Sequence, residues 1–215
     1  IENDMSMWWL SSQTAPLSAY HLRDYVANNA GDIYKDEQVR YVIEVDNAPS
    51  GAGLTAVGLI DLFNFSPLHR RAEVGIVIKR EYRNRGYAME AIGKMLRDKC
   101  ILITGAAGSI GSEIARQVAL FRPSHLILID QAETPMHDVR LFMAQSHRDL
   151  HVETIVTSIC NQEHMEKIFA QYRPEYVFHA AAYKHVPMME DNPAEAVQNN
   201  IYGTRVIADL AVKYG

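Results

Sequence analysis

Glycines at a fixed spacing are the residues of this sequence best suited to bind a phosphate group. Gly105, Gly108 and Gly111 form a G-x-x-G-x-x-G pattern. The pattern directly follows the apolar run 101–104 and opens a segment with helical periodicity. Such glycines allow a tight turn, close approach of the backbone to a pyrophosphate, and close packing of a helix on a strand. We therefore expect a strand, a phosphate-binding turn and a helix here.

An acidic residue and a run of alanines extend this prediction to a dinucleotide. Asp130 ends a second apolar run and follows Gly111 at close to the ~20-residue spacing of the carboxylate that binds an adenosine ribose. Ala180–Ala182 end a later apolar run, where small side chains leave room for a flat nicotinamide ring. Asp130 favours NAD, whereas an arginine such as Arg140 would accommodate the 2′-phosphate of NADP, so both cofactors stay open.

A second phosphate site is predicted upstream of the first. Gly86 and Ala88 remove side-chain bulk at the start of a helical run. Free backbone N–H groups and the positive end of the helix dipole can meet a pyrophosphate there. Arg83 and Arg85 add positive charge. The alternative is a capped surface helix with a solvated basic face, and the spacing alone does not decide between the two.

Hydrophobic periodicity predicts the elements that must position these residues. Residues 18–30 have the spacing of an amphipathic helix, and several following runs have the character of strands. From residue 101 onward, strands alternate with helices, as expected of a doubly wound parallel sheet. We expect strands at residues 38–45, 54–63, 71–79, 101–104, 125–130, 151–159 and 175–182.

The stretch EVGIVIKREYRNRGYAMEAI, residues 73–92, resembles the acetyl-CoA-binding segment of GNAT-type N-acetyltransferases of the ribosomal-protein and polyamine branch. Arg83, Gly86 and Ala88 match the family pattern Arg/Gln-x-x-Gly-x-Gly/Ala. The likeness covers residues 1–96 and implies acetyl-CoA as cofactor and an amine as acceptor. In this family the amine attacks the thioester beside the strand that corresponds to Glu73–Ile78. The resemblance assigns to acetyl-CoA the residues Arg83, Arg85, Gly86, Tyr87 and Ala88.

The stretches TGAAGSIGSE, DQAETPMHDVRL and AAYKHVPMME resemble the nucleotide-sugar 4,6-dehydratases of capsule and protein-glycan synthesis, which are extended short-chain dehydrogenases. The likeness covers residues 96–215. It implies hydride transfer from C4 of a UDP-N-acetylhexosamine, loss of water across C5–C6, and return of hydride to C6, with the protein supplying positioning and acid–base chemistry. It assigns to NAD(P) the residues Gly105, Gly108, Ser109, Ile110, Gly111, Asp130, Ile159, Ala180, Ala181 and Ala182.

The chain departs from the dehydratase pattern at two points. Ser158 stands before Ile159, where the family usually has an aspartate that contacts the adenine. None of the 11 tyrosines has a lysine four positions later, so the Tyr-x-x-x-Lys pair of the wider superfamily is not in this sequence. Lys184 and His185 are candidate substrate contacts, although a charged pair in such a loop is more often structural or solvated. No catalytic residue is assigned, and we expect the chain to be catalytically incomplete as it stands.

Composition excludes several other classes of function. The formal net charge of −5 argues against nucleic acid as the main partner, because phosphate-backbone binding needs a surplus of Lys and Arg. Cys100 and Cys160 lack zinc-site spacing and a disulfide pattern, which favours a reducing, cytoplasmic setting. The histidines show no ligand spacing with carboxylates, so we expect no metal site. No apolar run approaches the ~18 residues that span a bilayer, so we expect no membrane segment.

We predict an α/β chain in two parts. Residues 1–97 are a partial GNAT-like α/β fragment, and residues 98–215 are a partial Rossmann-type doubly wound parallel sheet. The start at Ile1 favours a fragment. Both resemblances stop short of a whole domain, so a chimera is the simplest expectation, and no linker rich in Gly, Ser or Pro separates its parts. In a second hypothesis, Ile101–Thr104 also lies beside Val74–Ile78 and merges the two sheets.

Three functions stay open at this level. The favoured one is an NAD(P)-binding, nucleotide-sugar 4,6-dehydratase-type domain fused to an acetyltransferase-like segment. The second is an acetyl-CoA-dependent N-acetyltransferase that modifies an amine. The third is a non-catalytic fragment or engineered hybrid. A nucleotide sugar is the expected small-molecule partner in the first case, and a homo-oligomer is compatible with all three.

Overall fold

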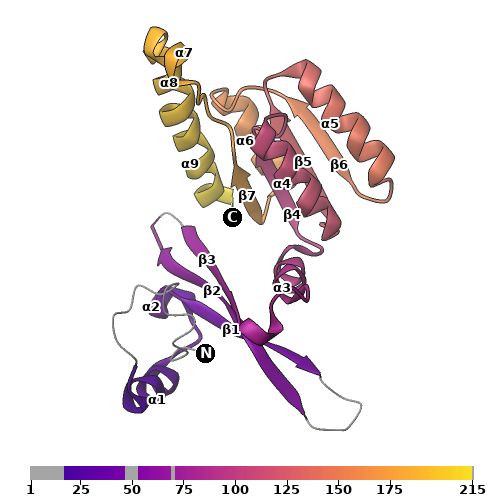
Figure 1. Cartoon of the computed structure of the whole chain (residues 1–215). Coiled ribbons are helices and arrows are strands. Elements are labelled where there is room, and N and C mark those ends of the chain that lie inside the picture. Colours follow the sequence, from indigo (N-terminus) through magenta and orange to yellow (C-terminus); the bar gives the residue numbers. More distant parts are fainter. Residues whose placement is uncertain (1–16, 47–52, 69–70, 215) are drawn as a thin grey trace. The chain divides into compact units, whose positions relative to one another are not determined.

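The computed structural model describes residues 17–46, 53–68 and 71–214. The chain divides into two compact units, Ile1–Ile92 and Gly93–Gly215 (Figure 1). Helix α3 (Tyr87–Leu96) contains the point of division, so its last turn belongs to the second unit.

The first unit is built on a three-stranded antiparallel sheet of order β1-β2-β3. Within the described part of this unit, Val57 and Ile60 of the central strand are the buried hydrophobic side chains. The elements are α1 (Ala19–Asn28), α2 (Ile33–Asp36), β1 (Val39–Asp46), β2 (Leu54–Ser66), β3 (Arg71–Ile78) and the 3₁₀ turn η2 (Arg80–Tyr82), followed by α3.

Local sequence explains the boundaries of these elements. The Ser18 side chain accepts a hydrogen bond from the His21 backbone N–H and so caps α1, as serine commonly does at this position. In β2 the pairing register shifts between Phe63 and Ser66, where Asn64 adopts a φ of 53°. Asn is among the few residues that tolerate this left-handed backbone, so the irregularity falls at a residue suited to it.

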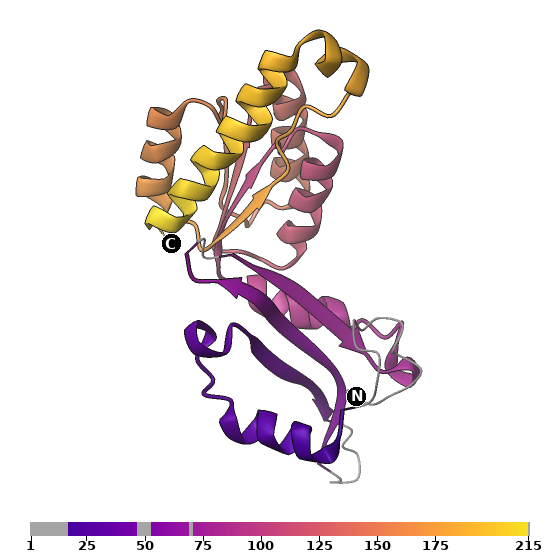
Figure 2. The same ribbon diagram turned by 90° about the vertical axis from the view of Figure 1, so that its left-hand side faces the viewer.

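The second unit is a four-stranded parallel sheet of order β6-β5-β4-β7. Helices α4 and α5 lie on one face of the sheet and α6 and α9 on the other (Figures 1 and 2), which confirms the predicted doubly wound architecture. The elements are β4 (Cys100–Thr104), α4 (Ser109–Leu120), β5 (His125–Asp130), α5 (Glu133–Ser146), β6 (Val152–Val156), α6 (Gln162–Tyr172), β7 (Tyr176–His179), α7 (Val186–Asp191), α8 (Pro193–Ala196), the π-helical turn η3 (Val197–Gly203) and α9 (Thr204–Tyr214).

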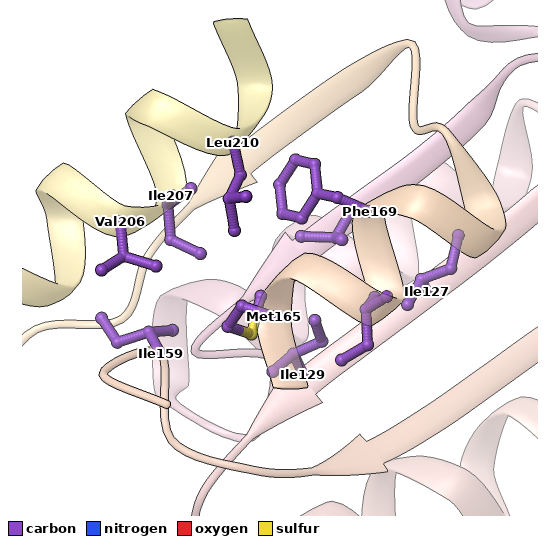
Figure 3. Packing of buried hydrophobic residues seen from close by; sticks show 10 residues of the cluster. Ile127, Ile129, Ile159, Met165, Phe169, Val206, Ile207 and Leu210 are labelled. Carbon is purple, nitrogen blue, oxygen red and sulfur yellow. The ribbon is translucent and has the colours of Figure 1, made fainter. Parts of the chain in front are cut away.

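The core of the second unit lies between the sheet and the helices α6 and α9 (Figure 3). Strands β4 and β5 are buried on both faces, as their uninterrupted apolar sequences predict. Figure 3 shows side chains from β5, α6 and α9 converging, with Phe169 fully buried among them. The buried members are Leu102, Ile127, Ile129, Ile159, Met165, Ile168, Phe169, Val206, Ile207 and Leu210.

The hypothesis of one merged sheet is wrong. Strand β4 is hydrogen-bonded to β5 on one edge and to β7 on the other, so it has no free edge for β3. Two predicted strands also end earlier than expected. Strand β6 stops at Val156 rather than residue 159, and β7 stops at His179 rather than residue 182. In both cases the chain leaves the sheet once the partner strand has ended, and these residues form the loops of its carboxyl edge.

Candidate functional site

The glycine-rich turn lies at the carboxyl end of β4, between that strand and α4. Gly105 has a φ of +68°, and a Cβ on it would come within 2.5 Å of the Ala181 backbone nitrogen. A Cβ on Gly111 would come within 2.0 Å of the Gly105 carbonyl oxygen. The fold itself therefore requires Gly105 and Gly111, because any side chain would collide with backbone.

Gly108 differs from the other two glycines of the pattern. Its φ of −74° suits any residue. Among the described atoms, a Cβ on Gly108 would meet the Gly105 carbonyl oxygen at 3.3 Å and nothing else within 4 Å. This single contact is tight but is not the outright collision found at Gly105 and Gly111. Close approach of a ligand to the backbone is a second reason for glycine at this position, so the turn fits a pyrophosphate.

Helix α4 begins directly after Gly108, which occupies the N-cap position and offers no side-chain hydrogen bond to the helix. The first backbone N–H groups of a helix have no partner within the helix. Those of Ser109 and Ile110 lie at the positive end of the α4 dipole, and both residues are exposed. This end of α4 can therefore bind an anion through its backbone.

Asp130 ends β5 and is held against the glycine-rich turn. One carboxylate oxygen accepts a hydrogen bond from the Ala107 N–H at 3.0 Å, and the other accepts one from the Ala132 N–H at 2.9 Å. Two backbone donors fix the carboxylate, while each oxygen keeps a further lone pair. The arrangement can accept hydrogen bonds from the hydroxyls of a ribose placed beside the turn.

The opposite wall of the site is the segment that follows β7. The Ala180 N–H donates to the Thr104 carbonyl at 3.0 Å, so this segment begins against the end of β4. Ala180 and Ala181 are partly buried against Gly105, and Ala182 is exposed. Ile159 lies elsewhere: its side chain is 4% exposed and belongs to the core.

Sequence reasoning missed His179, which joins three elements at this wall. Its Nδ1 lies 2.6 Å from the Thr104 hydroxyl, and its Nε2 lies 2.9 Å from the Thr204 hydroxyl. Because the Thr204 hydroxyl donates to the Asn200 carbonyl at 2.7 Å, it must accept from Nε2–H, which leaves Nδ1 to accept from Thr104. Although His179 as a whole residue is exposed, its ring is partly withdrawn from water between the two threonines, and this desolvation lowers the pKa of His179 and favours the neutral form. The sequence shows only that Thr104 ends one predicted strand and that His179 lies in another; their pairing as β4 and β7 comes from the structure.

The π-helical turn η3 supplies a second interaction that the sequence did not reveal. Asn200 accepts a hydrogen bond from the Tyr183 N–H and donates one to the Tyr183 carbonyl, both at 2.8 Å. Single π-helical turns are frequent at functional sites. The candidates Lys184 and His185 follow Tyr183 in an exposed loop, where His185 occupies the N-cap position of α7 without a side-chain hydrogen bond to the helix.

The basic turn of the first unit lies between β3 and α3. Arg83 Nε donates to the Ile78 carbonyl at 3.0 Å, which ties this side chain to the end of β3. Gly86 has a φ of +84°, a conformation that favours glycine, and its carbonyl accepts the Glu90 N–H of α3. The Arg85 guanidinium lies 5.4 Å from the centre of the Tyr82 ring. Tyr87 and Ala88 form the first turn of α3 and are half-buried.

Neither a metal cluster nor a membrane helix is found in the part of the chain that the structure describes. No three His, Cys, Asp or Glu side chains are grouped there so as to hold a metal ion. No helix in the same residues combines the length and apolar character needed to cross a bilayer.

A parallel doubly wound sheet with a glycine-rich turn and a fixed acid defines the second unit as a nucleotide-binding α/β protein. The chain belongs to the polysaccharide biosynthesis protein family, whose model matches residues 101–215. Residues 1–99 match the acetyltransferase (GNAT) domain model. Both resemblances drawn from the sequence are thus confirmed, since each part of the chain matches the model of a different family.

Three known proteins illustrate the similarity of the second unit. The chain is 40% identical over 121 residues to the probable polysaccharide biosynthesis protein EpsC of Bacillus subtilis, covering 56% of this chain and 20% of that protein. It is 32% identical over 114 residues to the dTDP-glucose 4,6-dehydratase of Salmonella typhimurium, covering 53% of this chain and 31% of that protein. The structure of Pen from Bacillus thuringiensis matches with 30% identity and a TM-score of 0.51, covering 55% of this chain and 36% of Pen. The chain spans about a third or less of the curated relatives that it matches.

Proposed function

We propose that residues 98–215 are the dinucleotide-binding part of a nucleotide-sugar 4,6-dehydratase-type protein of polysaccharide synthesis. The observation that carries the proposal is Gly108, where a Cβ would make one tight contact but no collision with the backbone, at the uncapped start of α4. Asp130 on one side and Ala180–Ala182 on the other lie where the two halves of a dinucleotide would extend from this turn. The family match over residues 101–215 supports the same conclusion.

We propose NAD rather than NADP as the preferred cofactor. The Asp130 carboxylate is held by two backbone N–H groups and cannot easily turn away from a bound ribose. It would accept hydrogen bonds from the ribose hydroxyls of NAD and would repel the 2′-phosphate of NADP. Arg140, the alternative phosphate contact, lies exposed on α5.

Each part of the site has a separate task in the proposed chemistry. When bound, the nicotinamide supplies the hydride acceptor and donor for oxidation and reduction of the sugar. The turn Gly105–Gly108 and the start of α4 bind the pyrophosphate, and Asp130 orients the adenosine ribose. Ala180–Ala182 leave a flat surface beside the reacting ring. Lys184 and His185 are the proposed contacts to a UDP-N-acetylhexosamine.

Acid–base catalysis is the task for which this sequence provides no assigned group. None of its tyrosines begins a Tyr-x-x-x-Lys pair. We therefore propose that these 215 residues bind the dinucleotide without turning over a nucleotide sugar. Cys100 and Cys160 are free thiols, which supports a reducing, cytoplasmic setting.

Acetyl-CoA binding by the first unit is a second proposed function. The observation that favours it is Arg83, tied to the end of β3 and placed just before the Gly86 turn that begins α3. The residues proposed to contact the CoA pyrophosphate are Arg83, Arg85, Gly86, Tyr87 and Ala88. An amine would be the acetyl acceptor, and residues 1–97 would form this domain.

The substitution Gly108→Val tests the dinucleotide proposal. We expect it to weaken NADH binding tenfold or more, because the branched side chain would occupy the path of the pyrophosphate, a loss of about 1.4 kcal/mol or more. The measurement is a titration of NADH with the full chain, in which NADH fluorescence reports binding. Ala144→Val is the control, because it places the same branched side chain on the exposed face of α5.

Binding measurements on the same variants also distinguish the two proposed functions. Acetyl-CoA binding, measured by calorimetry, should be unchanged in Gly108→Val. Equal NADH affinity in Gly108→Val and Ala144→Val would show that the turn does not bind the dinucleotide. If the unmodified chain bound acetyl-CoA but not NADH, the second proposed function would replace the first.

A further inference from the structure

A hydrogen bond joins the two sides of the proposed dinucleotide crevice. Gln131 Nε2 donates to the Tyr183 hydroxyl at 2.7 Å. Gln131 directly follows Asp130, the acid at the end of β5, and Tyr183 directly follows Ala182. The bond therefore connects the adenosine-ribose side of the crevice with the nicotinamide side.

The order of the strands determines what this bond must cross. Strand β4 lies between β5 and β7. Gln131 lies just beyond the carboxyl end of β5, and Tyr183 lies beyond the carboxyl end of β7. The turn Gly105–Gly108 rises from the carboxyl end of β4 between them. A dinucleotide that extends from Asp130 to Ala180–Ala182 must pass through the same interval, because ligands of such sheets bind where the strand order reverses.

The two ends of the bond are held with very different firmness. The backbone of Tyr183 is fixed on both sides by the Asn200 amide, with two hydrogen bonds of 2.8 Å. Asn199 also donates to the Asn200 side chain at 3.1 Å, which holds that amide in place. Gln131, in contrast, is an exposed residue between β5 and α5. The bond can therefore open by rotation of the Gln131 side chain alone.

The hydrogen bond between Gln131 and Tyr183 is weak enough to open often. Both partners are uncharged, and the bond is exposed to water. A neutral hydrogen bond of this kind contributes little net free energy, since water competes for both groups. The bond can open and close many times while a dinucleotide is bound. It would slow entry and release of the dinucleotide by a modest factor.

We propose that Gln131 and Tyr183 form a strap across the mouth of the dinucleotide crevice, which opens to admit or release the cofactor and closes over it when bound. This inference rests on the proposed dinucleotide function. A strap that closes equally over the free and the occupied crevice slows entry and release alike. It changes the rate constants and leaves the equilibrium affinity nearly unchanged.

The test is stopped-flow measurement of NADH binding and release with the full chain. Tyr183→Phe keeps the ring and removes the acceptor, and Gln131→Met keeps the length and removes the donor. We expect each variant to raise the association and dissociation rate constants together by about 2- to 10-fold, with a Kd within about twofold of the unmodified chain. The double variant should show no further increase, because either change alone opens the strap.

Tyr214→Phe is the matched control. It removes a tyrosine hydroxyl that donates to Glu166 at 3.1 Å, between α9 and α6, and should leave both rate constants unchanged. Rate constants in Tyr183→Phe equal to those of Tyr214→Phe would overturn the strap while leaving dinucleotide binding intact. An increase in the association rate constant alone would also overturn it, since the strap would then not close over the bound molecule. Failure of the unmodified chain to bind NADH would overturn the proposed function, and the strap with it.

Discussion

At the scale of single residues, the site depends on side chains that hold backbone segments in place. His179 is the clearest example, because it joins the end of β4 to the start of α9 through Thr104 and Thr204. Its neutral form is required, since Nδ1 must accept the Thr104 hydroxyl proton. A protonated ring would donate at both nitrogens and lose that bond. The residue is thus a positioning residue for the wall formed by Ala180–Ala182.

This role predicts a dependence of stability on pH. Burial lowers the folded-state pKa of His179 below its ordinary value of 6.5. Below pH 6.5 the unfolded chain therefore binds a proton that the folded chain does not, so the free energy of unfolding should fall as the pH drops from 6.5 through the folded-state pKa. Above pH 6.5 the contribution is fully present. His179→Gln should flatten this part of the profile, as measured by urea unfolding at several pH values.

The control for this experiment is His137→Gln, which changes an exposed histidine on α5. It should follow the profile of the unmodified chain. If His179→Gln lost as much stability between pH 7 and pH 5.5 as the control did, His179 would not be the group that titrates.

At the scale of elements, the π-helical turn η3 determines the course of the loop after β7. The Asn200 side chain pairs with both backbone groups of Tyr183, much as a neighbouring strand would. The loop can thus leave the sheet at His179 and remain ordered near the glycine-rich turn. The sequence predicted a longer strand here because three alanines continue the run, whereas β7 ends with its partner strand β4 and the Asn200 amide holds the chain further on, at Tyr183.

The substitution Asn200→Leu should release this loop. Because it removes two hydrogen bonds, each contributing about 0.5–1.5 kcal/mol, the Tyr183 amide should exchange with solvent about tenfold faster or more. Hydrogen exchange followed by NMR measures this directly. Asn192→Leu, which removes the hydrogen bond that the Asn192 side-chain N–H donates to the Met188 carbonyl, should leave Tyr183 exchange unchanged. Equal protection of the Tyr183 amide in the two variants would show that the two Asn200 hydrogen bonds do not hold this loop.

At the scale of the whole molecule, the boundary between the two units falls inside α3. The expected boundary after residue 97 follows the two resemblances, whereas the compact units divide after Ile92. A Cβ on Gly93 would come within 2.8 Å of the Phe121 ring, and Leu96 is 6% exposed. The Asp98 N–H also donates to the Arg122 carbonyl at 3.1 Å. We propose that the last turn of α3 stabilises the second unit.

Leu96→Ala tests this proposal in the full chain. Truncation of a buried leucine costs about 2–5 kcal/mol, so hydrogen-exchange protection in β4 and β5 should fall by a corresponding amount. Protection in β1 and β2 should not change. Met89→Ala, an exposed position in the first half of α3, serves as control. A loss of protection confined to the first unit would place the boundary after α3 instead.

The sequence by itself determined the features that depend on residues close together in the chain. The spacing of the glycines, the apolar runs 101–104 and 125–130, and the acid at position 130 were sufficient to predict a strand, a phosphate-binding turn and a helix. The stretches around Arg83 and Tyr183 were sufficient to recognise two families. Each of these signals lies within about one supersecondary unit, where local geometry follows from residue type.

Only the tertiary structure decided which distant residues meet. In it, both edges of β4 pair with strands of the same sheet. Thr104 is hydrogen-bonded to His179, and both Asn200 and Gln131 are hydrogen-bonded to Tyr183. The tertiary structure also distinguished Gly105 and Gly111, where a Cβ would collide with backbone, from Gly108, where a Cβ would make only one tight contact. The physical reason is that strand order and loop contacts depend on side chains far apart in sequence, whose pairing leaves no periodic trace along the chain.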